Sequence, residues 1–212
     1  MKDGKRLVIT IGRQFGSGGC EVGTKLAQEL GLDFYDKNIL RMNSDESGIK
    51  ESYYYMADEK AGNKLLYRII HSLIPENGTP SLGSDLISSD NLFRFQSSVI
   101  RKLAQEESCI IIGRCADYVL DGTENLVRLF VYAEIEERIN KVREKGYFPE
   151  EDILKNIKRI DRERRDYYRY YTGKSWENLE NYDLMINTTK LSYDDMVECV
   201  VDYLKMRGIL AK

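Results

Sequence analysis

The sequence predicts an α/β protein whose central parallel sheet is covered by helices on both faces. Short apolar runs rich in β-branched residues alternate along the chain with segments of helical periodicity. The first run also leads directly into a glycine-rich turn and then a helix, the order in which α/β proteins bind ligands at the carboxyl ends of strands. With 212 residues, 42% of them apolar, we expect one globular domain over residues 1–212.

Five strands are expected, because five short segments have the apolar composition of buried parallel strands. The first of them ends at Gly12 and is the expected central strand. The five segments are residues 7–11, 32–36, 108–113, 126–132 and 182–187.

Five helices are expected between and after these strands. Gly31 is a typical helix terminator, Pro149 suits a first helical turn, and Ser192 followed by Asp195 predicts an N-terminal cap. The expected helices are residues 21–30, 91–106, 135–145, 149–168 and 193–206.

The region between the second strand and the next helix differs from the rest of the chain. Residues 56–73 favour a helix, whereas residues 75–84 contain the Pro, Gly, Asn and Ser typical of a loop. We interpret residues 45–90 as an inserted, movable flap and not as a second domain.

Composition excludes several classes of function. The net charge of −3 gives no general attraction to nucleic acid or to anionic membranes, so an anion site has to be local. Four cysteines without a CxxC pair, together with the single His71, provide no zinc site and fit a reducing cytoplasm. No segment has the apolar length of a membrane helix, and the first residues do not resemble a signal peptide.

The glycine-rich turn GRQFGSGGCE, residues 12–21, resembles a phosphate-binding loop that lacks its lysine. The usual pattern GxxxxGK[ST] combines backbone amides with a lysine and a hydroxyl group. Here Arg13 stands at the first glycine, Gly19 at the lysine and Cys20 at the hydroxyl position, whereas Gly16, Ser17 and Gly18 preserve the turn. A helix that begins at such a turn favours an anion, and Arg13 can supply the missing cation. The alternative is a tight turn without a ligand.

Basic residues of the predicted helix at 149–168 and just beyond it repeat at i, i+4, i+7 and i+11. Like charges at this spacing destabilise a helix unless anions neutralise them. Either the row binds phosphate, or Glu151, Glu163 and Asp166 neutralise it on a solvated surface. The row consists of Lys158, Arg162, Arg165 and Arg169.

Aromatic residues interleave with these arginines, as in proteins that stack single-stranded nucleic acid. They are Tyr167, Tyr168, Tyr170, Tyr171 and Trp176. The cluster is short and the protein is acidic, so we expect no nucleic-acid partner.

Read in order, the loop at 12–21 and four further motifs resemble the cytidylate kinase-like family, relatives of bacterial cytidylate kinase. The further motifs are FYDK (34–37), LFRFQ (92–96), IIGRCAD (111–117) and DRERRDYYRYYTG (161–173). The resemblance covers nearly the whole chain. It implies a P-loop kinase-like, three-layer α/β/α fold with five parallel strands in the order 2-3-1-4-5. It also implies an ATP site at the loop, an acceptor site under the flap, and an arginine-rich lid at about 159–178.

The resemblance also assigns roles to individual residues. It places the donor phosphates around Gly16, Ser17, Gly18, Gly19, Cys20 and Glu21, and puts Asp36 near the acceptor. Arg114 matches the arginine of the Gly-Arg-Asp motif that serves the acceptor phosphate. The aspartate of that motif is Cys115 here, and Asp117 is the nearest replacement. The wider family commonly carries the Gly-Ser-Gly-Gly loop.

We expect the remaining roles as follows. Arg13, Arg164 and Arg169, followed by Arg162 and Arg165, are the expected catalytic cations. Phe93 and Gln96 are expected to border the acceptor base, although ordinary helix packing explains Phe93 equally well. Asp36 or Asp117 is expected to reach Mg²⁺ directly or through water.

The expected activity is transfer of the γ-phosphoryl group of ATP to a nucleoside monophosphate, (d)CMP first, or to a similar small phosphorylated acceptor. The main alternative is a nucleotide-binding regulatory protein that has lost efficient transfer. An oligomer is compatible with the sequence.

Overall fold

A computed structural model of the chain describes residues 6–36, 64–73 and 89–211. Its centre is a five-stranded sheet in the order β2-β3-β1-β4-β5, in which every neighbouring pair of strands is parallel. The expected order and the central place of the first strand are therefore confirmed. The strands are β1 (Val8–Arg13), β2 (Asp33–Tyr35), β3 (Cys109–Ile112), β4 (Leu126–Tyr132) and β5 (Leu184–Asn187).

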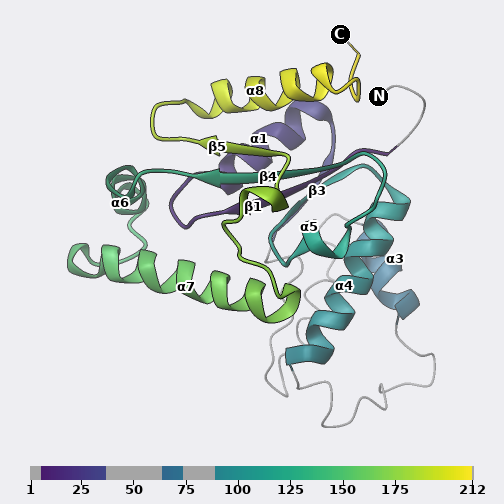
Figure 1. The fold of residues 1–212 in the computed structure, drawn as a ribbon, viewed down its shortest axis with the longest axis horizontal. Helices are drawn as coiled ribbons and strands as arrows, with labels where there is room; N and C mark the ends of the chain where they lie inside the picture. Colours follow the sequence, from purple (N-terminus) through teal and green to yellow (C-terminus); the bar gives the residue numbers. More distant parts are fainter. Residues whose placement is uncertain (1–5, 37–63, 74–88, 212) are drawn as a thin grey trace.

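Helices cover both faces of this sheet, as Figure 1 shows. On one face lie α1 (Gly19–Leu30) and α8 (Tyr193–Met206); on the other lie α3 (Lys64–Leu73), α4 (Ser89–Glu106) and α5 (Ala116–Val119). α6 (Ile135–Glu144) follows β4, and α7 (Ile153–Thr172) runs below the sheet in this view.

Alternation along the strands divides the core between the two faces. In β1, Ile9 and Ile11 pack toward α1 and α8, whereas Val8 packs toward α3 and α4. In β3, Ile110 and Ile111 divide in the same way. This two-sided burial explains the nearly continuous apolar runs that predicted the strands.

Two expected helix ends are confirmed in detail. Gly31 terminates α1 with a left-handed φ of 63°, and its amide bonds to carbonyl groups of the last turn. Ser192 and Asp195 form a reciprocal capping box at the start of α8.

The predicted boundaries of α7 were wrong at both ends. Pro149 precedes a short 3-10 turn, η4 (Glu150–Asp152), and the α-helix begins only at Ile153. At the other end the helix continues to Thr172, because Tyr168 and Tyr171 pack into an aromatic cluster, and it stops at Gly173 with φ 69°. The short helices α5 and η5 (Leu179–Asn181) were not predicted.

The expected flap lies largely outside the described residues. Within it, α3 confirms helix over residues 64–73 of the predicted 56–73. Residues 45–63 and 74–88 are not described, so the flap stays a prediction. None of the described helices has both the length and the apolar character to cross a membrane.

Candidate functional site

Two adjoining clefts lie at the carboxyl ends of the central strands, between the loop after β1 and α7. The first, of about 600 Å³, is bordered by the glycine loop and the start of α1. The second, of about 560 Å³, is bordered by the end of β3 and by the inner face of α7. Arg13, Phe15, Ile160 and Arg164 line both clefts, so they mark the boundary between them.

The glycine loop presents unpaired backbone amides to the first cleft. Gly16 and Gly18 have φ angles of 78° and 83°, which allow the chain to turn directly into α1. In the described part of the chain, no group accepts a hydrogen bond from the amides of Gly16, Gly18, Gly19, Cys20 and Glu21. These amides, together with the positive end of the helix dipole, make the first cleft suitable for an anion.

Ser17 has a different place from its neighbours. Its hydroxyl donates to the carbonyl oxygens of Gln14 (2.9 Å) and Val131 (3.1 Å), and its own carbonyl accepts from Thr188 Oγ1 at 2.8 Å. Ser17 is fully buried and fixes the loop to the sheet. Its hydroxyl therefore points away from the first cleft.

Arg13 is buried and Arg164 is half-buried, and neither forms an ion pair within the described residues. Arg13 is 8% exposed, its Nε has no acceptor among the described residues, and burial lowers its pKa. Burial, and next the charge of Arg13, lower the pKa of Arg164 to about 9. Arg164 donates to the carbonyl oxygen of Arg13 at 2.8 Å. Within the described residues neither guanidinium has a carboxylate within ion-pair distance, so an anion between the clefts would relieve the cost of burying both.

The end of β3 places two further predicted residues on the second cleft. Gly113, Arg114 and Cys115 follow one another with left-handed φ angles of 72°, 55° and 54°. The Arg114 guanidinium lies 5.7 Å from the ring centre of Tyr167. Asp117 also lines this cleft, but Tyr168 donates to it at 2.6 Å, and burial raises its pKa.

We expect Gly113→Ala to lower the free energy of unfolding by about 1–2 kcal/mol and to displace Arg13. A left-handed φ costs alanine about this amount, and a Cβ here would lie 2.5 Å from Nη1 of Arg13. Gly122→Ala is the control, because its φ is 79° but nothing lies within 4 Å. Urea unfolding and nucleotide titration check this: equal nucleotide affinity of the two variants would contradict the role of Gly113 in placing Arg13.

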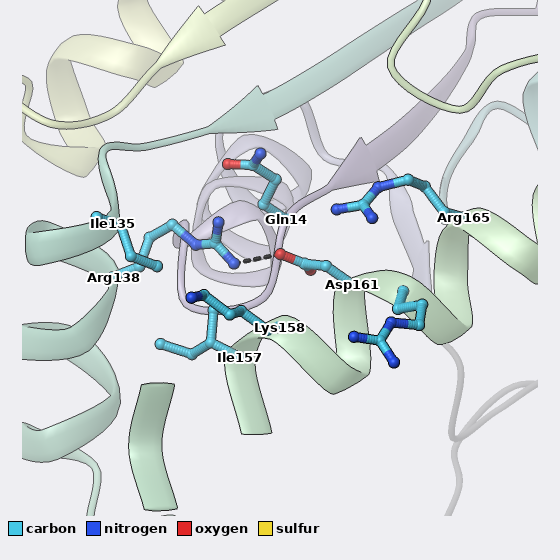
Figure 2. Close-up of a pocket in the computed structure, with 8 residues that line it drawn as sticks. Gln14, Ile135, Arg138, Ile157, Lys158, Asp161 and Arg165 are labelled. Atoms are coloured by element: carbon cyan, nitrogen blue, oxygen red, sulfur yellow. Dashed lines mark hydrogen bonds and ion pairs between the residues drawn. The ribbon is translucent and has the colours of Figure 1, made fainter. Parts of the chain in front are cut away.

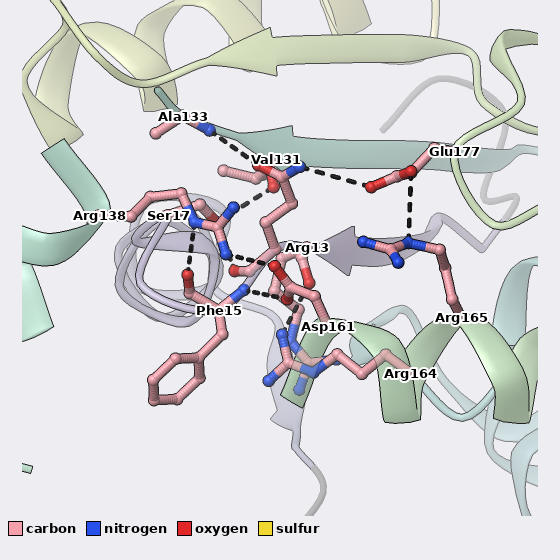
Figure 3. A network of polar contacts seen from close by, with 11 residues as sticks. Arg13, Phe15, Ser17, Val131, Ala133, Arg138, Asp161, Arg164, Arg165 and Glu177 are labelled. Carbon is pink, nitrogen blue, oxygen red and sulfur yellow. Dashed lines mark hydrogen bonds and ion pairs between the residues drawn. The ribbon is translucent and has the colours of Figure 1, made fainter. Parts of the chain in front are cut away.

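An ion pair that sequence reasoning missed fixes the loop to α7 (Figure 3). Asp161 accepts a hydrogen bond from the Phe15 amide at 2.8 Å and forms a buried ion pair with Arg138. Arg138 Nε donates to the Phe15 carbonyl at 2.7 Å. Asp161 opens the quoted basic motif, but its role was hidden because the sequence does not show that α7 packs on the loop.

The structure separates the predicted arginines of α7. Arg164 faces the two clefts, whereas Arg162 and Arg165 line a third pocket, together with Lys158 (Figure 2). Arg169 is exposed and lines none of these three sites.

Phe93 and Gln96, on α4, line neither cleft within the described part of the chain. Phe93 stacks on Tyr171, with ring centres 4.0 Å apart and an interplanar angle of 13°, as the packing interpretation anticipated. Gln96 is buried, with 3% of its surface exposed. Of the aromatic residues that interleave with the arginines, Tyr168 and Trp176 are buried, whereas Tyr170 is 70% exposed.

The carboxylates suit a metal ion only in part. Asp36, just after β2, lines the first cleft. Glu21 lines it too, but it pairs with Lys145. The described residues contain no group of three or more metal-ligating side chains. Mg²⁺ usually takes one or two carboxylates and completes its shell with phosphate oxygens and water, so Asp36 in the first cleft is a suitable ligand.

Comparison with solved structures identifies the fold of this protein. An uncharacterized protein from Eubacterium ventriosum is 24% identical, with 94% of this chain and 99% of that chain covered and a TM-score of 0.69. Shikimate kinase from Acinetobacter baumannii, solved with shikimate, gives 13% identity, coverage of 98% and 97%, and a TM-score of 0.51. Shikimate kinase from Bacteroides thetaiotaomicron gives 12% identity, coverage of 96% of this chain and 99% of that chain, and a TM-score of 0.50. The protein thus has the P-loop kinase-like fold.

Its family follows from the sequence. The model of the cytidylate kinase-like family matches residues 8–190, and the chain belongs to this family. A search of curated proteins gave no match.

Proposed function

We propose that the protein transfers the γ-phosphoryl group of ATP to a small phosphorylated acceptor, with a nucleoside monophosphate such as (d)CMP as the first candidate. The proposal rests mainly on one observation: buried Arg13 and half-buried Arg164 lie at the boundary of two adjoining clefts, and neither forms an ion pair within the described residues. A phosphoryl group that passes from one cleft to the other would meet both cations.

In this proposal the first cleft holds the donor and the second holds the acceptor. Free amides of Gly16, Gly18 and Gly19 bind the donor phosphates, and Arg114 binds the acceptor phosphate. Phosphoryl transfer needs positioning and neutralisation of charge more than covalent chemistry. A phosphate acceptor is already ionised near neutral pH, so it requires no general base.

The same arrangement accounts for the missing loop lysine. The side chain of Arg13 lies directly against Gly19: a Cβ at Gly19 would lie 2.6 Å from the Arg13 Cβ. The residue at the lysine position must therefore be small, and the cation comes from the end of β1. A planar guanidinium can contact two phosphate oxygens at once.

Bound Mg²⁺ would neutralise the donor phosphates. Asp36 is the carboxylate best placed to hold it, because it lines the donor cleft. Asp117 is a weaker candidate, since its carboxylate accepts from Tyr168 and lies in the acceptor cleft.

A nucleotide-binding regulatory protein remains the second candidate. One observation favours it: Cys20 replaces the loop hydroxyl that usually reaches magnesium, and the Ser17 hydroxyl is turned inward. Such a protein would bind ATP without transferring its phosphoryl group.

Formation of ADP with ATP, Mg²⁺ and a panel of acceptors separates the two candidates. The panel contains the ribonucleoside and deoxyribonucleoside monophosphates, and shikimate as an acceptor without phosphate. We expect ADP to form faster with at least one monophosphate than with shikimate or water. Tight ATP binding with no acceptor-dependent ADP would favour the regulatory protein.

A further inference from the structure

Within the described residues, the basic row on α7 has few acidic partners. Glu163, the nearest compensating acid in the sequence, pairs with Arg159 at 2.6 Å. Among the described residues, Lys158 and Arg162 have no carboxylate within ion-pair distance, and Arg165 reaches only Glu177, at 3.5 Å. Lys158, Arg162 and Arg165 are themselves exposed, so water solvates this side of the helix while few carboxylates compensate its charge.

Lys158, Arg162 and Arg165 border a further pocket of about 280 Å³, which shares Gln14 with the first cleft and no described residue with the second. Figure 2 shows the labelled side chains of Lys158 and Arg165 extending from α7 on either side of Asp161. Gln14 and Arg138 line the same pocket. The residues that face the clefts, Ile160 and Arg164 among them, lie on a different side of the helix.

The charge of the pocket is positive. Asp161 is the one acidic residue among its described lining residues, and its two oxygens already serve the Phe15 amide and Arg138. Lysine and arginine at i, i+4 and i+7 repel each other unless an anion lies between them. The volume of about 280 Å³ is large enough for a phosphate group with accompanying water, and guanidinium groups suit phosphate oxygens.

We propose that Lys158, Arg162 and Arg165 form a second anion site, behind the glycine loop, that binds a phosphate dianion. The phosphate is either free or part of a small phosphorylated molecule. This site shares Gln14 with the first cleft, but neither Arg13 nor Arg164, the cations between the donor and acceptor clefts, lines it.

Side-chain NMR of the full chain labelled with [15N]arginine tests the proposal. The Nε–H signals of Arg162 and Arg165, assigned from single Arg→Lys variants, are followed during titration at constant ionic strength. The probes are inorganic phosphate, pyrophosphate and glycerol phosphate. We expect the Arg165 signal to shift and saturate; tighter saturation by phosphate indicates the free ion, and tighter saturation by glycerol phosphate indicates a phosphorylated molecule. The Arg13 and Arg164 signals report the clefts separately, so failure of the proposed transfer function does not affect this test.

A pair of variants makes the result specific. Lys158→Gln with Arg162→Gln is expected to weaken the response of Arg165 by about tenfold or more, since charge-assisted hydrogen bonds are lost. Lys155→Gln with Lys190→Gln removes the same charge from exposed positions outside the pocket and should leave the response unchanged.

Three outcomes would overturn the proposal. The first is a linear, unsaturated shift, and the second is equal weakening by both pairs of variants. The third is saturation by oligouridylate that tightens with oligonucleotide length and falls steeply with salt, because the row would then be a nucleic-acid surface.

Discussion

Replacing Arg164 with glutamine is expected to lower kcat for phosphoryl transfer by about 10²–10³ and to change KM for ATP much less. Arg164 lies between the two clefts, and burial disfavours its charge in the free protein. The Arg164 guanidinium would pair with the negative charge that develops on the transferring phosphoryl group, so this interaction strengthens in the transition state. Single preorganised donors of this kind contribute about 10²–10³ to kcat, and arginines in phosphoryl transfer up to about 10⁵.

Steady-state kinetics with the best acceptor from the panel would check this, with Lys155→Gln as the control. Lys155 lies exposed on the same helix and carries the same charge. Arg164→Lys should recover only part of the loss, because an ammonium group cannot make the two-point contact of a guanidinium. A loss confined to KM, or a loss below tenfold in kcat, would show that Arg164 binds substrate without stabilising the transfer.

Most of the fold was predictable because the signals that define it are local. The apolar runs of β1 and β3 predict strands that are buried on both faces. Gly31 and Ser192 predict helix ends, because glycine favours the left-handed C-cap and serine the N-cap. The boundaries of α7 were less predictable. Its last turn depends on contacts of Tyr168 and Tyr171 with an aromatic cluster from distant segments, and a periodicity argument does not include such contacts.

The site was predictable in its loop and less so in its cations. Gly16 to Gly19 had to form a turn before α1, so the free amides of its glycines followed from the sequence. Which arginine of α7 faces the clefts depends on the rotation of the helix about its axis. That rotation is set by the contact of Asp161 with the Phe15 amide, which joins residues 146 positions apart. Helical spacing grouped Arg162 and Arg165 correctly on one side, but it gave no indication that this side faces another pocket.

Asp161→Asn is expected to lower the free energy of unfolding by about 3–5 kcal/mol, the usual cost of leaving one partner of a buried ion pair alone. Arg138 and Asp161 are 6% and 3% exposed, so little water is available to solvate the remaining guanidinium. The amide oxygen of asparagine can still accept the hydrogen bond from the Phe15 amide. The loss of stability would therefore measure the contribution of the Asp161 charge and not that of the backbone hydrogen bond.

A double-mutant cycle with Arg138→Met separates the pair from its surroundings. If the two charges stabilise mainly each other, the double variant should be more stable than either single variant, because no buried charge is left unpaired. Unfolding in urea gives the four free energies, and losses that add within about 0.5 kcal/mol would contradict the coupling. Because Arg138 also donates to the Phe15 carbonyl, the double variant should retain the fold but hold the loop less firmly. Its nucleotide affinity should therefore fall even where its stability recovers, a combination expected only if the ion pair positions the loop as well as stabilising the protein.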